Sequence, residues 1–205
     1  MSTSDSTRGR ARARAGANFA LIKYWGKADA RLNVPAVGSI SITLDALWSE
    51  TTVELDSKLA ADEFSLNGRT RPQEQAKVLA CLDLLRARAG VATRARITSR
   101  NNFPTGAGLA SSASGFAALV TAGAAALGLT PSPRERSIYA RQGSGSAARS
   151  VFGGFVEMHA GTAPDGLDSF AEPLLDAAAW PLEVVIRSEE HTSELQSRGL
   201  ISYAV

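Results

Sequence analysis

A stretch of small residues near the middle of the chain has the composition of an anion-binding loop. Residues 101–119 read NNFPTGAGLASSASGFAAL, a proline–glycine turn followed by Ser111, Ser112 and an apolar run. A glycine-rich turn leading into a helix points several backbone N–H groups at one spot, where the helix dipole favours negative charge. The Ser112 hydroxyl could then contact phosphate or Mg²⁺. Alternatively, the two serines only cap the helix and the small residues allow close packing.

A second segment of similar character follows at residues 141–150, RQGSGSAARS. Ser144, Gly145 and Ser146 offer hydroxyls and accessible backbone. Arg149 offers a planar guanidinium suited to carboxylate or phosphate. The alternative interpretation is an ordinary turn with a surface arginine.

A third candidate lies at residues 22–27, IKYWGK, where Lys23, Tyr24 and Lys27 could hold an anion. Tyr24 and Trp25 could equally be simple core and rim residues. Taken together, the three segments suggest a ligand with several phosphates. With two histidines and one cysteine in the chain, any metal is expected to be Mg²⁺ on oxygen ligands. The loop is not a Walker A motif, because no lysine follows its last glycine.

The elements that must position these segments are a mixture of strands and helices. Helices are expected over 72–89, closed by Gly90, over about 108–127, ended by Gly128, and around 135–140. Strands are expected at 17–25, 38–45, 51–55, 63–68, 92–99, 153–161 and 182–186. Strands and helices do not alternate strictly, which favours an α+β fold over a doubly wound sheet.

The bulk properties suit one globular domain of 205 residues, with 44% hydrophobic and 20% charged side chains. No apolar run approaches the length of a membrane span, and the N-terminus lacks a secretory signal core. Cys81 lies among Val78, Leu82 and Leu85, so it is interpreted as helix packing and not as a nucleophile. A single cysteine makes a cytoplasmic location the simplest expectation.

The two ends of the chain are expected to lie outside the folded domain, which is assigned to residues 17–186. Residues 1–16 hold four arginines against one aspartate and are interpreted as a disordered basic tail, with no nucleic-acid surface on the body. Residues 187–205 resemble the in-frame translation of a sequencing-library adapter. The hypothesis is that this segment is non-native, so that His191 carries no chemistry.

Four segments closely resemble the diphosphomevalonate decarboxylase family of the GHMP kinase superfamily: NFALIKYWGK, LNVPAVGSISITL, NNFPTGAGLASSASGFAAL and GSGSAARSVFGGFV. The resemblance runs from Asn18 to Ile186 and implies the α+β N-terminal domain of that superfamily, of the ribosomal-protein-S5 domain-2 type. The resemblance further implies that the family's ferredoxin-like C-terminal domain is not part of this sequence. It also implies ATP and Mg²⁺ as cofactors, mevalonate 5-diphosphate as substrate, no nucleic-acid or membrane partner, and a homodimeric parent enzyme.

The resemblance also implies roles for individual residues. The ATP loop would comprise Pro104, Gly106, Ala107, Gly108, Leu109, Ala110, Ser111 and Ser112, with Ser112 near Mg²⁺. The substrate diphosphate would contact Tyr24, Lys27, Ser144, Gly145 and Ser146, with Lys23 nearby. Asn18 and Arg149 would orient the carboxylate end of the substrate, so the implied catalytic residues are Arg149, Asn18 and Ser112.

One departure from the family pattern affects the expected activity. The family has an aspartate in its C-terminal half that faces the reacting hydroxyl, and Asp165 and Asp168 do not replace it. The chain is therefore expected to be inactive in turnover. The alternatives are a phosphomevalonate decarboxylase, a mevalonate 3-kinase, or a non-catalytic nucleotide-binding relative.

Overall fold

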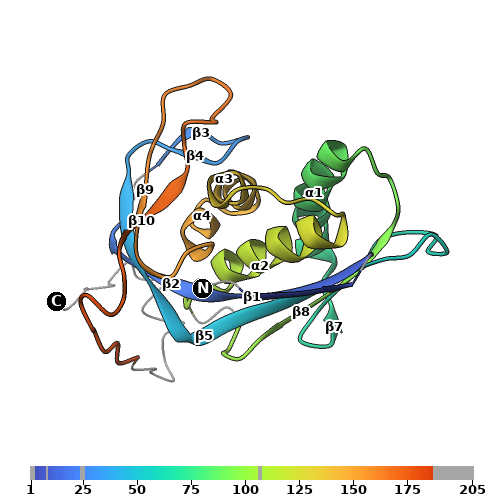
Figure 1. Ribbon diagram of the computed structural model, residues 1–205, viewed down its shortest axis with the longest axis horizontal. Coiled ribbons are helices and arrows are strands. Elements are labelled where there is room, and N and C mark those ends of the chain that lie inside the picture. The colour runs from blue at the N-terminus through green and yellow to red at the C-terminus, as the bar shows by residue number, and fades with distance from the viewer. Residues whose placement is uncertain (1–2, 8, 24–25, 106–107, 187–205) are drawn as a thin grey trace.

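The computed structural model describes residues 3–7, 9–23, 26–105 and 108–186, and Figure 1 shows a bent sheet with helices packed on one face. The helices are α1 (Pro72–Ala89), α2 (Ser111–Ala126), α3 (Pro133–Gly143) and α4 (Ala147–Ser150). The strands are β1 (Thr3–Thr7), β2 (Arg10–Ile22), β3 (Lys27–Asp29), β4 (Val34–Pro35), β5 (Ser39–Leu55), β6 (Glu63–Leu66), β7 (Arg69–Thr70), β8 (Ala95–Asn101), β9 (Gly154–Met158) and β10 (Ala171–Leu175). The fold is thus mixed α and β, as expected.

Two long strands, β2 and β5, run through both halves of the sheet. Its main order is β1-β2-β5-β8-β6-β7, while β9 pairs with the first half of β5 and β10 pairs with β9. The β2–β5 register shifts between Gly16 and Asn18, where the sheet bends. A Cβ at Gly16 would lie 2.5 Å from the Leu44 carbonyl oxygen, so only glycine allows this approach.

The expectation of a disordered basic tail over residues 1–16 is wrong, because residues 3–7 form β1, which pairs with β2, and residues 10–16 lie in β2 itself. The sequence Arg-Ala-Arg-Ala-Arg-Ala has the period of a strand, and in β2 its alanines are buried while Arg10, Arg12 and Arg14 are exposed. The carboxylates of Glu54 and Glu50 lie 3.5 Å and 3.1 Å from Arg10 and Arg14. Alanine burial against the helices and pairing with β5 therefore order a segment whose charge alone suggests disorder.

The core lies between the sheet and a central helix, α2, that is buried nearly all round. Small side chains on α2 and on the inner face of β2 let the helix lie close to the sheet. Helix α1 packs on α2 where a Cβ at Gly123 would lie 3.0 Å from both Leu82 and Leu85. This packing places the first turn of α2, and the loop before it, at the edge of the helical layer.

Most expected elements are present, with several differences at their ends. Helix α1 matches its expected bounds, and Gly90 adopts the left-handed conformation that ends it. Helix α2 begins three residues later than expected because Ala110 is left-handed, with φ 53°. Helix α3 is longer than expected and begins at a capping box formed by Ser132 and Glu135.

Three strand expectations need correction. Residues 38–45 and 51–55 belong to one continuous strand, β5, because β2 spans both. Residues 182–186 form no strand, and no pairing with a described strand includes them. The short pairs β3–β4 and β9–β10 were not fully anticipated, because two to five residues carry little periodic signal. Residues 187–205 lie outside the described residues.

Candidate functional site

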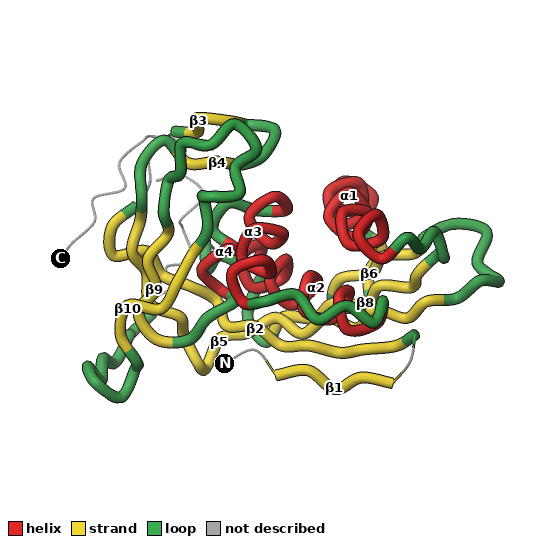
Figure 2. Tube along the Cα trace, turned by 45° about the horizontal axis from the view of Figure 1, so that its top comes forward, coloured by secondary structure: helices red, strands yellow, loops and turns green. Residues whose placement is uncertain are grey.

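A cleft of about 1040 Å³ opens between α1, the first turn of α2 and the end of α3. In Figure 2, α1 stands over β6 and β8, apart from α3 and the β3–β4 hairpin. The described lining residues at the polar end include Lys27, Asn33, Ser112, Ser144 and Gly145. Apolar side chains from the sheet and helices line the rest, among them Phe64, Leu66, Val78, Ile97 and Leu119. The cleft therefore combines a polar end with an apolar wall.

The two serine-containing loops meet at the polar end. The Ser112 Oγ lies 3.4 Å from the Ser144 Oγ, although 32 residues separate them. Both residues line the cleft, and so do Ser111 and Gly145. Loops that were separate candidates in the sequence thus share one site.

Ser111 and Ser112 do not cap α2. The N-cap residue is Ala110, and no side chain makes a capping hydrogen bond there. The Ser112 side chain is exposed toward the cleft, and the first N–H groups of a helix have no partner within the helix. The capping alternative is therefore wrong, and Ser111 and Ser112 lie at the cleft without serving as caps.

A hairpin carries Lys27 to the opposite side of the polar end. The Lys27 Nζ donates to the Asn33 Oδ1 at 2.7 Å, and the Asn33 Nδ2 donates to the Gln142 carbonyl at 2.7 Å. Asn33 adopts φ 53°, a conformation that asparagine tolerates better than most residues. Because Gln142 comes shortly before Ser144, this asparagine connects the lysine to the second loop.

Arg141, on α3, anchors the same β3–β4 hairpin through a hydrogen bond. Its side chain is fully buried and donates to the Leu32 carbonyl at 3.1 Å and to the Gly166 carbonyl at 2.7 Å. Burial lowers the pKa of Arg141, an effect that Asp168 and Asp29 partly offset. A buried guanidinium bonded to carbonyls fixes the position of α3 against the hairpin and the 161–169 loop.

Arg149 and Asn18 form a buried polar cluster beside the cleft. Arg149 is 2% exposed and donates to the Ser39 Oγ, to the Ser41 Oγ at 3.0 Å and to the Asn18 Oδ1 at 3.4 Å. Asn18 in turn donates to the Ser146 carbonyl at 2.9 Å. The alternative interpretation, a surface arginine in an ordinary turn, is wrong. The cluster connects strands β2 and β5 to the second loop.

The structure brings some expected site residues together and leaves others apart. Lys27, Ser111, Ser112, Ser144 and Gly145 line the cleft, and Asn18, Ser146 and Arg149 form the adjoining cluster. Pro104, Gly108, Leu109, Ala110 and Lys23 are described but are not among the lining residues. Tyr24, Gly106 and Ala107 lie outside the described residues.

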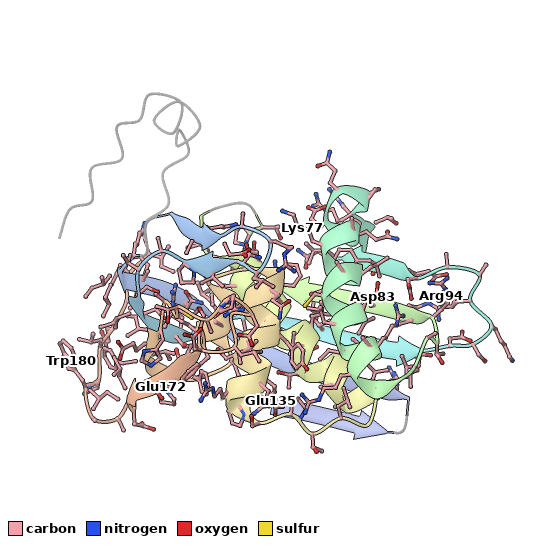
Figure 3. All side chains as sticks on the ribbon, turned by 90° about the horizontal axis from the view of Figure 1, so that it is seen from above. Lys77, Asp83, Arg94, Glu135, Glu172 and Trp180 are labelled. Atoms are coloured by element: carbon pink, nitrogen blue, oxygen red, sulfur yellow. The ribbon has the colours of Figure 1, made fainter. Side chains whose placement is uncertain are left out.

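Sequence reasoning missed Asn33, Asn101, Thr105 and Lys77, all of which line the cleft. Figure 3 shows Lys77 on α1, far along the chain from both loops. The Asn101–Asn102 pair, directly before the glycine loop, was an available signal. The Asn102 side chain accepts from the Trp48 N–H and donates to the Ala46 carbonyl, both at 2.7 Å, which holds the loop on β5.

The described residues hold no group of three or more histidine, cysteine or acidic side chains that could bind a metal ion. A polyphosphate fits the donor set at the polar end, where hydroxyls, backbone N–H groups and the Lys27 ammonium converge. The Ser112 hydroxyl could serve as one oxygen ligand of a phosphate-bound Mg²⁺. No helix in the described part of the chain has the length and apolarity needed to span a membrane.

Cys81 lines the apolar wall yet is expected to be chemically inert. The residue is 2% exposed, and burial raises the pKa of its thiol to about 12. At pH 8 only about 10⁻⁴ of the thiol would be ionised, and the thiolate is the nucleophile. A disulfide reagent at pH 8 should therefore leave the native chain unlabelled for many minutes and label it fully in denaturant. Rapid labelling of the folded chain would contradict this burial.

The family model and the curated relatives that match this chain indicate the same family. A family model described as the diphosphomevalonate decarboxylase-like N-terminal domain matches residues 15–171. Diphosphomevalonate decarboxylase mvd1 of Aspergillus fumigatus is 48% identical over 195 residues, covering 87% of this chain and 48% of the relative. The human diphosphomevalonate decarboxylase is 40% identical over 186 residues, covering 82% of this chain and 46% of its own.

Solved structures give the same result. The mevalonate diphosphate decarboxylase of Enterococcus faecalis superimposes with a TM-score of 0.77 at 47% identity, over 83% of this chain and 53% of that chain. A structure of MDDEF in complex with MVAPP, AMPPCP and magnesium superimposes with a TM-score of 0.76, over 83% of this chain and 52% of that one. The chain spans about half the length of the curated relatives it matches.

Proposed function

This chain belongs to the diphosphomevalonate decarboxylase-like family, and on that premise we propose that it forms the ATP- and substrate-binding half of such an enzyme. The parent reaction would phosphorylate the tertiary hydroxyl of mevalonate 5-diphosphate with ATP. Loss of that phosphate and of CO₂ would then yield isopentenyl diphosphate, with ADP as the other product. The observation that carries the proposal is the 3.4 Å contact between Ser112 and Ser144, which joins the two loops in one cleft.

Each part of the cleft has a role in this proposal. The α2 loop, with the Ser111 and Ser112 hydroxyls, holds the ATP phosphates, and bound Mg²⁺ would neutralise charge on them. Lys27, Ser144 and Gly145 hold the substrate diphosphate on the facing side. Phosphoryl transfer depends on positioning and charge stabilisation more than on covalent help, which suits a site made of fixed donors.

The buried cluster would act at the carboxylate end of the substrate. Asn18 and Arg149 join the second loop to β5, so this cluster lies next to the proposed diphosphate contacts. We propose that Arg149 holds the carboxylate so that its breaking C–C bond aligns with the departing phosphate. We also assign Tyr24 to substrate binding and Gly106 and Ala107 to ATP binding, three residues outside the described part of the chain.

Among the described residues that line the polar end, none supplies a carboxylate that could accept the proton of the tertiary hydroxyl. Among the described lining residues Glu74, on α1, is the one acidic side chain. Asp168 is held by the N–H groups of Thr162 and Ala163, which lower its pKa, and Asp165 accepts from the Leu167 N–H. We propose that turnover needs a further carboxylate, which the described residues do not supply.

The experiment separates binding from turnover. Calorimetry with ATP should show saturable binding, with a dissociation constant in about the micromolar to millimolar range. A coupled ADP-release assay with ATP and mevalonate 5-diphosphate should give no signal above background. Normal turnover by these residues alone would refute the need for a further carboxylate, and absence of ATP binding would refute the site.

A matched pair of lysine variants tests the substrate side. Lys27→Gln should weaken inorganic diphosphate binding roughly 5–10-fold, because one charge-assisted hydrogen bond is lost. Lys58→Gln removes the same charge from an exposed loop away from the cleft and should leave binding unchanged. In the complete enzyme, mevalonate, its 5-phosphate and its 5-diphosphate assayed side by side would identify the substrate.

A further inference from the structure

Thr105 lies at the edge of the cleft, between the asparagine pair and the glycine loop, and its side chain is exposed there. Its Oγ1 receives two hydrogen bonds, from the Asn67 Nδ2 at 3.2 Å and from the Asn101 Nδ2 at 3.1 Å. A hydroxyl has two acceptor lone pairs and one proton to donate. Both acceptor positions of the Thr105 hydroxyl are therefore filled. The only hydrogen bond that the hydroxyl can still make is one in which it donates its proton.

The orientations of the two amides follow from their other contacts. The Asn67 Oδ1 accepts from the Asn101 backbone N–H at 2.9 Å, so its NH₂ group must face Thr105. The Asn101 oxygen lies 2.6 Å from the Ser49 Oγ, a normal length for O–H···O but short for N–H···O. The Asn101 NH₂ group therefore also faces Thr105, and both neighbours act as donors.

The network behind Asn101 is buried and directional. Ser49 is fully buried and its single proton is committed to the Asn101 oxygen. The Ser114 Oγ, also fully buried, then donates to the Ser49 Oγ at 2.7 Å in preference to the Ser111 carbonyl at 3.4 Å. This chain of hydroxyls runs from α2 through β5 to the loop. It fixes the orientation of the Asn101 amide. The Thr105 hydroxyl therefore accepts from Asn101 and has its own proton free to donate.

We propose that Thr105 is a hydrogen-bond donor to the nucleotide bound in the cleft, held in that role by Asn67 and Asn101. No described acceptor other than a ligand or solvent oxygen takes its proton. A donor whose direction is set before binding suits an anionic or carbonyl-like acceptor and disfavours a ligand donor at the same point. The inference rests on the proposed nucleotide site and adds a contact that fixes the ligand's orientation.

The first test uses a variant with nearly the same shape. Thr105→Val should weaken ATP binding to the 205-residue chain about 5–10-fold, the usual effect of one lost hydrogen bond. Thr105→Ser keeps the hydroxyl and should bind within about twofold of wild type. Thr70→Val, an exposed threonine of β7 outside the lining residues, controls for the substitution itself. Inorganic tripolyphosphate measured in parallel identifies the acceptor. Loss with both ligands assigns it to the phosphates, and loss with ATP alone assigns it to the nucleoside.

Thr105→Val also leaves the NH₂ groups of Asn67 and Asn101 without an acceptor, which could disturb the loop. A second variant therefore distinguishes the direction of the Thr105 proton from a change in loop structure. Asn67→Asp keeps the acceptor for the Asn101 N–H and turns the remaining side-chain atom into an acceptor for the Thr105 proton. The hydroxyl should then point away from the ligand. Adding Thr105→Val to Asn67→Asp should therefore cost little further affinity, and charge is constant within that comparison.

The outcomes are distinct. If Thr105→Val binds ATP within twofold of the wild-type affinity, the inference is overturned, but the proposed nucleotide site is not. An equal loss from Thr105→Val in the wild-type and Asn67→Asp backgrounds would also overturn it, since proton direction would not matter. A wild-type chain that binds neither ATP nor tripolyphosphate would overturn the site and the inference together.

Discussion

Replacing Arg149 with lysine is expected to lower the free energy of unfolding by about 2–4 kcal/mol, although the positive charge is kept. The guanidinium donates at the same time to Ser39, Ser41 and Asn18, which come from two different strands. A single ammonium cannot reach three acceptors arranged around a planar group, so hydroxyl and amide oxygens in a nearly dry cluster lose their partners. Equilibrium unfolding in urea, monitored by circular dichroism, measures the change.

Arg69→Lys is the matched control for this variant. Arg69 lies in β7 and is exposed, so the same substitution there should change the unfolding free energy by no more than about 0.5 kcal/mol. Equal small effects at both positions would show that the cluster around Arg149 does not hold the second loop in place. The cluster also supports the Ser146 carbonyl through Asn18, so diphosphate binding should weaken together with stability.

Asp62→Asn is expected to destabilise the chain by about 3–5 kcal/mol, because it leaves the buried Arg86 with only the exposed Asp83 as counter-ion. The Asp62 carboxylate accepts from both Arg86 Nη atoms, at 2.6 Å and 3.1 Å, and from the Ala95 N–H at 2.7 Å. Both side chains are at most 7% exposed. Glu63→Gln, which breaks the half-exposed pair with Arg96, should cost no more than about 1 kcal/mol.

The same pair makes stability depend on pH in a defined direction. Burial alone would raise the pKa of Asp62, but hydrogen bonds from Arg86 and Ala95, with the charges of Arg86 and Arg94, hold it below its usual value. A carboxyl whose pKa is lower when folded stabilises fully above its unfolded pKa of about 3.9 and loses that contribution as pH falls through the folded value. The difference between wild type and Asp62→Asn should thus be constant from neutral pH to about 5 and shrink below about 4. A constant difference down to pH 2 would refute the charged pair.

Local patterns predicted most of the architecture. Helix α1 followed from apolar spacing between Pro72 and Gly90, and the half-buried strands followed from alternation. The arginine-rich segment at residues 10–15 shows the same alternation, although its net charge suggests disorder. Burial of three alanines on α2 decided the outcome, and composition does not show which helix a strand face will meet.

The chemistry of the candidate site was also readable from residue types. Two loops of small residues and hydroxyls, with lysines nearby, indicated a polyphosphate ligand before any position in space was known. What the chain order could not show was that Ser112 and Ser144 touch, that Asn33 ties Lys27 to the second loop, or that Arg149 is buried. Backbone periodicity and turn chemistry act over a few residues and are therefore visible in the sequence. Apart from the Lys27–Asn33 contact within one hairpin, the contacts that complete this site join residues 32 to 131 positions apart, and only packing of the helices on the bent sheet brings them together.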